Sequence, residues 1–248
     1  MYIYIFIDGS VSGRYNAHTA IFTHMVIYMI LLIANTKGGV GKTSLATSIL
    51  AALAKDKGVV GVDLDSVNKA ASDEWSKNRT ELDGRFYFLS GSVGEKIKEL
   101  ADDYDEVVID AGGYDNTEYR QAIEVADVVL IPLLVGSNSN IEGLRKVAET
   151  IEKIRPKNPP KVYGVVTKAP HHTASPELDR AINEIINDPL VQPCPTVIGD
   201  RVWYTRSFDE GIGLLDLKPI KRNETKYIEI AQNEFLNLFN FIYGGKND

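Results

Sequence analysis

The sequence predicts an α/β fold, in which helices cover both faces of a mostly parallel, twisted sheet. Three observations lead to this prediction. Short apolar runs alternate with segments of helical spacing, and a glycine-rich loop separates the first apolar run from the first helix. The chain has 248 residues, of which 44% are hydrophobic, enough to bury one substantial core. The composition, with 25% charged residues, excludes a disordered chain, a collagen and a coiled-coil rod.

Each element follows from a local pattern. Apolar runs predict strands at 29–34, 59–64, 86–89, 106–109, 128–132, 161–167 and 196–198. Apolar residues three or four positions apart predict helices at 44–57, 93–100, 117–125, 140–154, 176–186 and 225–243. In the first helix, for example, Leu45, Ile49 and Leu53 recur every four residues, and Gly58 marks the end. Strands that alternate with helices pair in parallel and bind ligands at their C-terminal ends.

The first residues stand apart from this pattern. We predict an N-terminal extension at 1–28 and one domain at 29–248. The extension has neither the basic leading region nor the small-residue cleavage site of a signal peptide. The apolar run at 25–34 is shorter than the roughly 20 residues that span a bilayer. Two interpretations remain open: a start-site extension, or a strand added to the edge of the sheet.

Charge and cysteine content limit the partners. Lys and Arg number 27 against 34 Asp and Glu, so the net charge is −7 and any contact with DNA needs a local basic patch. A single cysteine, Cys194, forms no internal disulfide and no four-thiolate metal site, which fits a reducing cytoplasm. The densest basic cluster is either a solvated loop or a contact with the DNA backbone; it comprises Lys218, Lys221, Arg222 and Lys226.

A phosphate loop is the strongest signal. The segment Lys-Gly-Gly-Val-Gly-Lys-Thr-Ser at 37–44 lies between the first strand and the first helix, although Thr36 stands where the usual pattern has glycine. Its glycines let backbone N–H groups point into one cavity. Lys42 would reach the β- and γ-phosphates of ATP, and the Thr43 hydroxyl would bind Mg²⁺. The expected nucleotide-binding residues here are Gly38, Gly39, Val40, Gly41, Lys42, Thr43 and Ser44.

Carboxylates end two of the predicted strands. Asp63 and Asp65 project to the same side because side chains alternate along a strand. Two like charges beside an apolar sheet are costly unless a cation or a water network accepts them. Asp110 ends the apolar run 107–109 in the form of a Walker B strand, and we expect it to hold Mg²⁺.

The lysine directly after the first strand makes the phosphate loop resemble the deviant Walker A box of the ParA/MinD ATPase superfamily. The resemblance covers most of the chain from Met29 onward. It implies that Lys37 reaches across an ATP-sandwich dimer to the phosphates of the partner subunit, where it acts in catalysis with Lys42. A lysine beside a polyphosphate neutralises the charge that develops during transfer, as an arginine finger does.

The acidic segments also resemble boxes of this superfamily. The family form Asp-x-Asp-Pro-Gln continues here with Ser66 and Val67, and the resemblance implies that Asp65 positions the attacking water and lies near Mg²⁺. After Asp110 the family often has Thr-Pro-Pro, whereas this chain has alanine and two glycines at 111–113. Glycines there leave room for backbone that moves when the γ-phosphate departs.

Two later segments resemble the part of the family that surrounds adenine. Thr167 and Lys168 end a strand at which related proteins contact the base. The segment 195–217 resembles a C-terminal family segment in which Arg201 matches the arginine and Phe208 replaces a usual alanine. We expect the backbone from Ile198 to Arg201 to line the base. For Arg201, a structural salt bridge is an equally open interpretation.

The resemblance implies an ATP-dependent DNA partition ATPase. Such a protein dimerises on binding ATP, binds DNA non-specifically and hydrolyses ATP when a small centromere-binding or cargo adaptor protein stimulates it, in the cytoplasm on the nucleoid. Membrane binding is not expected, because 227–243 carries Glu229 and Glu234 and no basic residue. The alternatives are a ParA-like positioning ATPase for a protein assembly, a MinD-like cell-division ATPase and a P-loop metabolic ligase.

Overall fold

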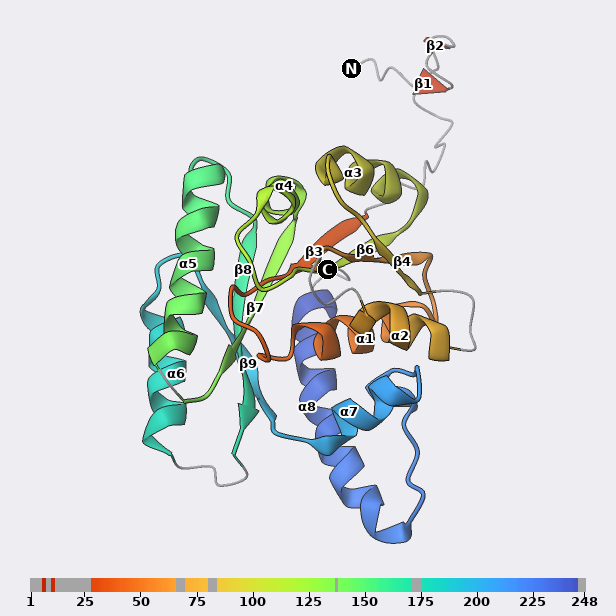
Figure 1. The fold of residues 1–248 in the computed structure, drawn as a ribbon, viewed down its shortest axis with the longest axis vertical. Coiled ribbons are helices and arrows are strands. Elements are labelled where there is room, and N and C mark those ends of the chain that lie inside the picture. The colour runs from red at the N-terminus through yellow and green to blue at the C-terminus, as the bar shows by residue number, and fades with distance from the viewer. Residues whose placement is uncertain are drawn as a thin grey trace, which may run out of the picture.

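A seven-stranded parallel sheet organises the chain (Figure 1). The computed structural model describes residues 6–7, 10–11, 28–65, 70–79, 84–136, 138–170 and 175–244. The strand order is β5-β4-β6-β3-β7-β8-β9, and every neighbouring pair is parallel. The predicted α/β fold is therefore confirmed. The strands are β3 (Met29–Ile33), β4 (Val59–Asp63), β5 (Phe86–Phe88), β6 (Glu106–Asp110), β7 (Val128–Leu134), β8 (Lys161–Ala169) and β9 (Gln192–Gly199).

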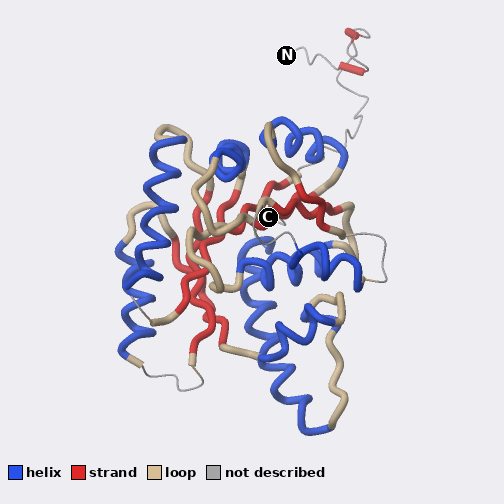
Figure 2. Tube along the Cα trace, in the orientation of Figure 1, coloured by secondary structure: helices blue, strands red, loops and turns tan. Residues whose placement is uncertain are grey.

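Helices cover both faces of this sheet, as Figure 2 shows. On one face lie α3 (Val93–Asp103), α4 (Thr117–Val125), α5 (Asn138–Ile154) and α6 (Pro176–Asn187). On the other lie α1 (Lys42–Leu53), α2 (Ala70–Asn78), α7 (Val202–Asp209) and α8 (Thr225–Tyr243). Two short 3₁₀ turns, η1 (Leu214–Asp216) and η2 (Arg222–Glu224), connect α7 to α8.

The core is divided by the sheet into two apolar layers. Ile30 and Leu32 of β3 pack toward α3 to α6, and Leu31 and Ile33 pack toward α1 and α8. This division follows from the alternation of side chains along a strand. Every residue of β3, β4 and β6 is buried, as expected of parallel strands covered on both faces.

The observed elements differ from the expected ones mainly at their ends. Helix α1 begins at Lys42, two residues before the expected start, and ends at Leu53 because 54–56 form a turn. Strand β9 is longer than the expected 196–198. The sequence did not predict α2 or α7: α2 is mostly polar around Trp75, and α7 has only 8 residues. Both are too weakly periodic to recognise alone.

Four N-terminal residues form a separate pair of strands. Strands β1 (Phe6–Ile7) and β2 (Ser10–Val11) pair with each other in antiparallel fashion. They do not join the large sheet, whose edges are β5 and β9. These four residues therefore do not form the added edge strand considered above. The remaining residues of 1–27 lie outside the described part of the chain, and the division into 1–28 and 29–248 stays a prediction.

The C-terminal helix α8 packs into the core. Ile228, Ala231, Phe235, Leu238 and Ile242 are buried and belong to the apolar layer on the side of α1. Within the described ranges, no helix combines the length and the apolar character needed to cross a membrane.

Candidate nucleotide-binding site

The phosphate loop connects β3 to α1 at the C-terminal edge of the sheet. Gly39 and Gly41 have φ angles of 75° and 94°, in the left-handed region that favours glycine. A Cβ atom at Gly38, Gly39 or Gly41 would meet no atom within 4 Å, so the loop borders open space. Among the described residues, no side chain caps α1 at Gly41. The first N–H groups of the helix therefore remain available to an anion.

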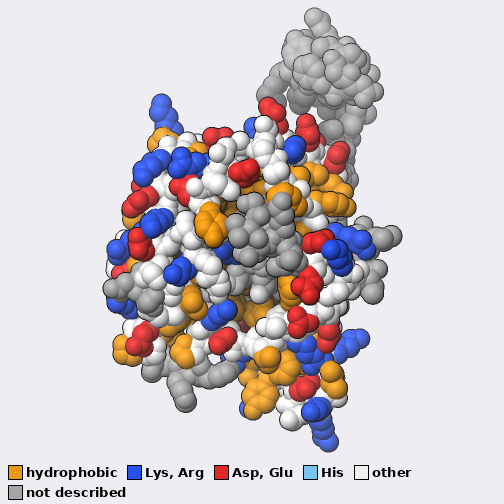
Figure 3. All heavy atoms as spheres, viewed as in Figure 1, with side chains coloured by type: hydrophobic (Ala, Val, Ile, Leu, Met, Phe, Trp, Pro, Cys, Tyr) orange, Lys and Arg blue, Asp and Glu red, His pale blue; other side chains and the backbone are white. Residues whose placement is uncertain are grey.

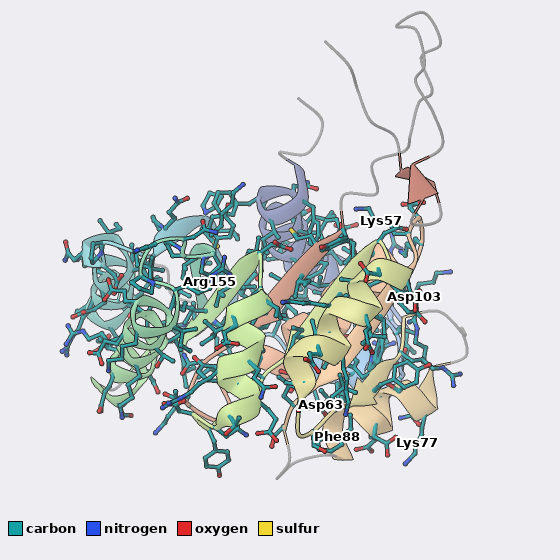
Figure 4. All side chains as sticks on the ribbon, turned by 90° about the horizontal axis from the view of Figure 1, so that it is seen from above. Lys57, Asp63, Lys77, Phe88, Asp103 and Arg155 are labelled. Atoms are coloured by element: carbon teal, nitrogen blue, oxygen red, sulfur yellow. The ribbon has the colours of Figure 1, made fainter. Side chains whose placement is uncertain are left out.

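A cavity of about 730 Å³ opens beside this loop. Loops that follow β3, β4 and β6 line it, because the C-terminal ends of these parallel strands meet at one edge. Figure 4 shows Asp63 and Phe88 together at this end of the sheet, with Lys57 at the other. The lining residues are Thr36, Gly38, Gly39, Gly41, Lys42, Thr43, Ser44, Asp63, Asp65, Glu74, Asp110, Ala111, Gly113, Tyr114 and Lys168.

Asp110 lies at the floor of the cavity beside the start of α1. The Thr43 hydroxyl donates a hydrogen bond of 2.6 Å to Oδ2 of Asp110. The other oxygen, Oδ1, is buried and has no hydrogen-bond partner among the described residues. Burial raises the pKa of Asp110 to about 7, although the Thr43 hydrogen bond opposes the shift. An unpartnered buried carboxylate oxygen next to a hydroxyl suits Mg²⁺, which prefers oxygen ligands.

The two lysines of the loop have different surroundings. Lys42 is buried, and its Nζ donates a hydrogen bond of 3.0 Å to the backbone carbonyl of Lys37. Burial lowers the pKa of Lys42, and Asp110 and Asp65 counteract that shift. Lys37 is exposed between Thr36 and Gly38, both of which line the cavity. One lysine thus points toward the phosphate loop, and the other stands at the surface beside it.

Asp63 connects the end of β4 to α2. Its Oδ1 accepts the backbone N–H of Asp65 at 2.7 Å, and its Oδ2 accepts the hydroxyl of Ser72. Burial raises the pKa of Asp63, and these hydrogen bonds counteract the shift. Asp63 therefore fixes the start of the chain segment that carries Asp65, which is half-buried in the cavity wall. Ser66 and Val67 lie outside the described residues.

The loop after β6 packs tightly against Asp65. A Cβ atom at Gly112 would lie 3.1 Å from Cα of Asp65, closer than most non-bonded contacts. The nearest atoms to a Cβ at Gly113 would be the Thr36 carbonyl at 3.7 Å and the Gly38 nitrogen at 3.8 Å. These glycines let the loop fit between the phosphate loop and Asp65.

A smaller cavity of about 120 Å³ adjoins the first on the side of β8 and β9. Its wall includes four of the residues expected at the base: Thr167, Lys168, Ile198 and Arg201. The Thr167 hydroxyl donates a hydrogen bond of 2.8 Å to the carbonyl of Val40, which ties this strand to the phosphate loop. Lys168 lines both cavities and has a φ of 50°, a conformation that is uncommon for a residue with a side chain.

The sequence left two interpretations of Arg201 open, a residue beside the base and a structural salt bridge. The structure contains the salt bridge. The Nη2 atom of Arg201 lies 2.6 Å from Oε1 of Glu234 on α8, and both side chains are largely buried. Oε2 of Glu234 also accepts the backbone N–H of Gly199 at 3.1 Å. Arg201 lines the smaller cavity at the same time, so the two interpretations do not conflict.

Sequence reasoning missed several residues of the site. Glu74 and Ser72 come from the unpredicted helix α2, and Tyr114 lies just beyond the Walker B segment with 59% of its surface exposed. Glu234 was noted only as a charge on the last helix. A carboxylate in the middle of an apolar-rich helix was the available signal that it has a buried partner.

The basic cluster lies between α7 and the first turn of α8. Its four members are exposed, and none forms an ion pair with a described residue. The one acid within 218–226, Glu224, accepts the backbone N–H of Ile220 at 2.8 Å and pairs with Arg206 at 3.1 Å. Glu224 is therefore engaged elsewhere and leaves the cluster with a net positive charge. Figure 3 shows Lys and Arg side chains at this lower end of the molecule.

Comparison with known families agrees with this geometry. The sequence model described as "CobQ/CobB/MinD/ParA nucleotide binding domain" matches residues 31–213. The chain belongs to this family of nucleotide-binding domains, and the ParA/MinD-type members are P-loop ATPases.

Three curated proteins illustrate the relationship. Maintenance of carboxysome distribution protein A of Halothiobacillus neapolitanus is 26% identical, covering 83% of this chain and 95% of that protein. Protein ParA of Rhizobium radiobacter is 28% identical, covering 82% and 92%. An uncharacterised ATP-binding protein of Methanocaldococcus jannaschii is 29% identical over 48% of this chain, and the match spans only 58% of that protein.

Solved structures share the fold. The ATP complex of a Cyanothece McdA variant aligns with a TM-score of 0.65 at 16% identity, over 88% of this chain and 97% of that chain. The MinD protein of Pyrococcus horikoshii, solved with Mg-ADP, aligns with a TM-score of 0.60 at 18% identity, over 87% and 96%. At these identities the likeness concerns the fold alone.

Proposed function

We propose that this chain is a ParA-type partition ATPase. It binds ATP and Mg²⁺, forms an ATP-sandwich dimer, binds DNA without sequence preference and hydrolyses ATP when an adaptor protein on the cargo stimulates it. The observation that supports this most is the position of Lys37. Its side chain is exposed beside the phosphate cavity, where it is available to a second subunit, whereas Lys42 already serves the cavity from within.

The phosphate side of the site binds and orients the triphosphate. The N–H groups from Gly38 to Ser44 and the Nζ of Lys42 hold the phosphates. Thr43 and Asp110 would hold Mg²⁺, with Asp65 nearby, since one Asp110 oxygen is buried and has no hydrogen-bond partner in the described part of the chain. When bound, the ion neutralises charge on the β- and γ-phosphates.

Hydrolysis requires a positioned water and a stabilised leaving charge. Asp65 orients the water, because Asp63 and the loop at Gly112 hold its backbone beside the cavity. Lys37 of a second copy supplies positive charge to the phosphates. A single subunit lacks the Lys37 of a second copy and therefore hydrolyses ATP slowly. Dimerisation thus controls the rate of hydrolysis.

The adenine lies in the smaller cavity. Thr167, Lys168, Ile198 and Arg201 line it, and its volume of about 120 Å³ suits a part of the ligand that is flat and compact. Thr167 holds the wall in place through Val40, so its hydroxyl has no proton left to donate to the base.

DNA binding belongs to the basic cluster Lys218, Lys221, Arg222 and Lys226. A chain with a net charge of −7 repels DNA as a monomer. A two-fold dimer presents two copies of the cluster, and each added phosphate contact releases counterions and steepens the salt dependence. We place this protein in the cytoplasm on the nucleoid, with a small centromere-binding or cargo adaptor as its partner.

The test is fluorescence anisotropy with random-sequence duplexes over a salt series. Asp65→Ala traps the ATP-bound dimer, so it should bind DNA with ATP and poorly with ADP. Lys221→Glu combined with Arg222→Glu should remove that binding while the dimer persists. Lys96→Glu with Lys98→Glu is the matched control: these lysines are exposed on α3, on the other face of the sheet, and the charge change is equal. Equal DNA binding with both nucleotides would contradict the switch.

A second candidate function has one supporting observation. The Halothiobacillus relative is named for carboxysome distribution, and its similarity covers 83% of this chain. A positioning ATPase for a protein assembly would form the same ATP-dependent dimer. ATP-dependent DNA binding that persists in the basic-cluster variant would place the DNA contact elsewhere, and an equal loss in the α3 variant would mean that net charge and not the cluster is the cause. No DNA binding by the trapped dimer would favour this second candidate.

A further inference from the structure

Asn35 stands between β3 and the phosphate loop and is completely buried. Its Nδ2 donates a hydrogen bond of 2.8 Å to the carbonyl of Pro132 on β7, and its Oδ1 accepts the backbone N–H of Lys37 at 2.8 Å. The partners fix the orientation of the amide, because a carbonyl only accepts and an N–H only donates. Ala34 makes the preceding bond to Leu130, so Asn35 extends the β3–β7 ladder with its side chain.

Helix α5 closes the third side of this amide. A Cβ atom at Gly143 would overlap Oδ1 of Asn35 and would lie 3.3 Å from its Cγ and 3.5 Å from its Nδ2. A glycine inside a 17-residue helix weakens the helix relative to alanine, so its presence calls for a reason. Here the reason is space: α5 packs directly on the Asn35 amide, which two hydrogen bonds prevent from turning away.

Both backbone groups of Lys37 are therefore engaged. Its N–H is held by Asn35, and its carbonyl accepts the Nζ of Lys42 at 3.0 Å. The direction in which a side chain leaves the backbone depends on its own φ and ψ, so fixing the groups on either side of Lys37 fixes that direction. If Lys42 gives up its bond to the Lys37 carbonyl on binding phosphate, the Asn35 bond is the one of the two that remains.

We propose that Asn35 is a positioning residue for Lys37, and that the glycine at 143 leaves the space that the Asn35 amide needs. This inference rests on the proposed function, because it gives Asn35 its effect only through the role of Lys37 toward a second subunit. Asn35 is fully buried and lines neither of the two cavities. Disturbing it should leave ATP binding by one subunit nearly intact and should impair the steps that need Lys37.

The main test is Gly143→Ala, with Gly94→Ala as its matched control. Both change a helical glycine to alanine, but a Cβ at Gly94 would make an ordinary contact of 3.5 Å with Gln121. We expect Gly143→Ala to reduce the turnover rate and ATP-dependent dimerisation by about tenfold, as small misplacements at active sites do. Its Kd for a fluorescent ATP analogue should stay within about threefold. Gly94→Ala should match the unchanged chain.

Two combinations separate positioning from general damage. Gly143→Ala in a Lys37→Ala background should cause no further loss of turnover, because the residue being positioned is already gone. Adding Asn35→Ser to Gly143→Ala removes the overlapping atoms and should raise the melting temperature without restoring turnover. Two results would overturn the proposal. One is that Gly143→Ala lowers turnover further in the Lys37→Ala background. The other is that Asn35→Ser restores the turnover of Gly143→Ala together with its melting temperature.

Failure of the inference and failure of the proposed function give different results. If Lys37→Ala dimerises and hydrolyses ATP normally, the cross-subunit role of Lys37 is wrong whatever Asn35 does. If Lys37→Ala is impaired while Gly143→Ala and Asn35→Ser have full turnover, the role of Lys37 stands and the positioning role of Asn35 is wrong.

Discussion

The two halves of the candidate site are built in different ways. The phosphate side consists of loops that directly follow β3, β4 and β6, and its charged groups point into one cavity of about 730 Å³. The base side is a cavity of about 120 Å³ formed by β8, β9 and α7 and supported from behind by α8. The first half carries the reactive groups, whereas the second is shaped by packing and by one ion pair.

This difference predicts different responses to substitution. On the phosphate side, a single side chain interacts with full charges, so its removal should affect binding or chemistry strongly. On the base side, Arg201 is held by Glu234 and the Thr167 hydroxyl by Val40, so a substitution that loosens this support should act indirectly and weakly.

Lys42→Ala should have the largest effect. The buried ammonium lies inside the phosphate cavity at the start of α1, and we expect the affinity for ATP·Mg²⁺ to fall about 100-fold or more. Isothermal titration calorimetry measures the affinity, and an unchanged cooperative melting transition shows that the fold persists. Near-normal ATP affinity in a folded variant would refute the assignment of the phosphate loop.

Asp65→Ala and Lys37→Ala should separate chemistry from assembly. Asp65→Ala should bind ATP and accumulate as a dimer, because the attacking water is no longer oriented. Lys37→Ala should bind ATP yet dimerise and hydrolyse it poorly. Light scattering with ATP, combined with a phosphate-release assay, measures both properties. A Lys37→Ala dimer with normal turnover would contradict the cross-subunit role.

Gly112→Ala should slow hydrolysis more than it weakens binding. The added Cβ, at 3.1 Å from Cα of Asp65, must displace backbone by some tenths of an ångström. We expect a drop in turnover of about tenfold with little change in ATP affinity. Gly113→Ala is the control, since its Cβ would make ordinary contacts at 3.7 Å and beyond. Equal losses in the two variants would mean that proximity to Asp65 is not the cause.

Glu234→Gln should have a moderate effect from the base side. It weakens the pair with Arg201 and lowers the free energy of unfolding by about 1–3 kcal/mol. ATP affinity should fall by a few fold, because the strand end that lines the base loses support. Glu229→Gln, an exposed position on the same helix, controls for the charge change. Chemical denaturation and calorimetry give the two quantities, and an equal effect at Glu229 would exclude the ion pair as the reason.

Removal of the residues before Met29 should have the smallest effect. No predicted site residue lies there, and β1 and β2 pair only with each other among the described strands. The shortened chain should melt, bind ATP and hydrolyse it like the full chain. Its failure to fold would show that the extension belongs to the domain.

The phosphate side was predictable because its residues are local in sequence. Each lies within a few positions of the end of an apolar strand. The apolar run and the polar residues that follow it therefore locate the phosphate side of the site in the sequence. The base side was only partly predictable: Arg201 was found, but its partner Glu234 lies 33 residues later on α8. Ser72 and Glu74 escaped because α2 lacks a clear apolar period. Only the packing of α2 beside β4 brings Ser72 to Asp63 and Glu74 to the cavity.

Helix α8 gives the base side a wider consequence. Its first turn carries Lys226 of the basic cluster, and Glu234, two turns later, holds the strand end beside the base cavity. The single helix α8 thus connects the basic cluster, which we propose binds DNA, with the smaller cavity, which we propose binds adenine. Thermodynamic reciprocity then fixes a relation between the two equilibria: if ATP strengthens DNA binding by a given factor through this helix, DNA must strengthen ATP binding by the same factor. The nucleoid would in that case act as an effector that retains nucleotide on the protein.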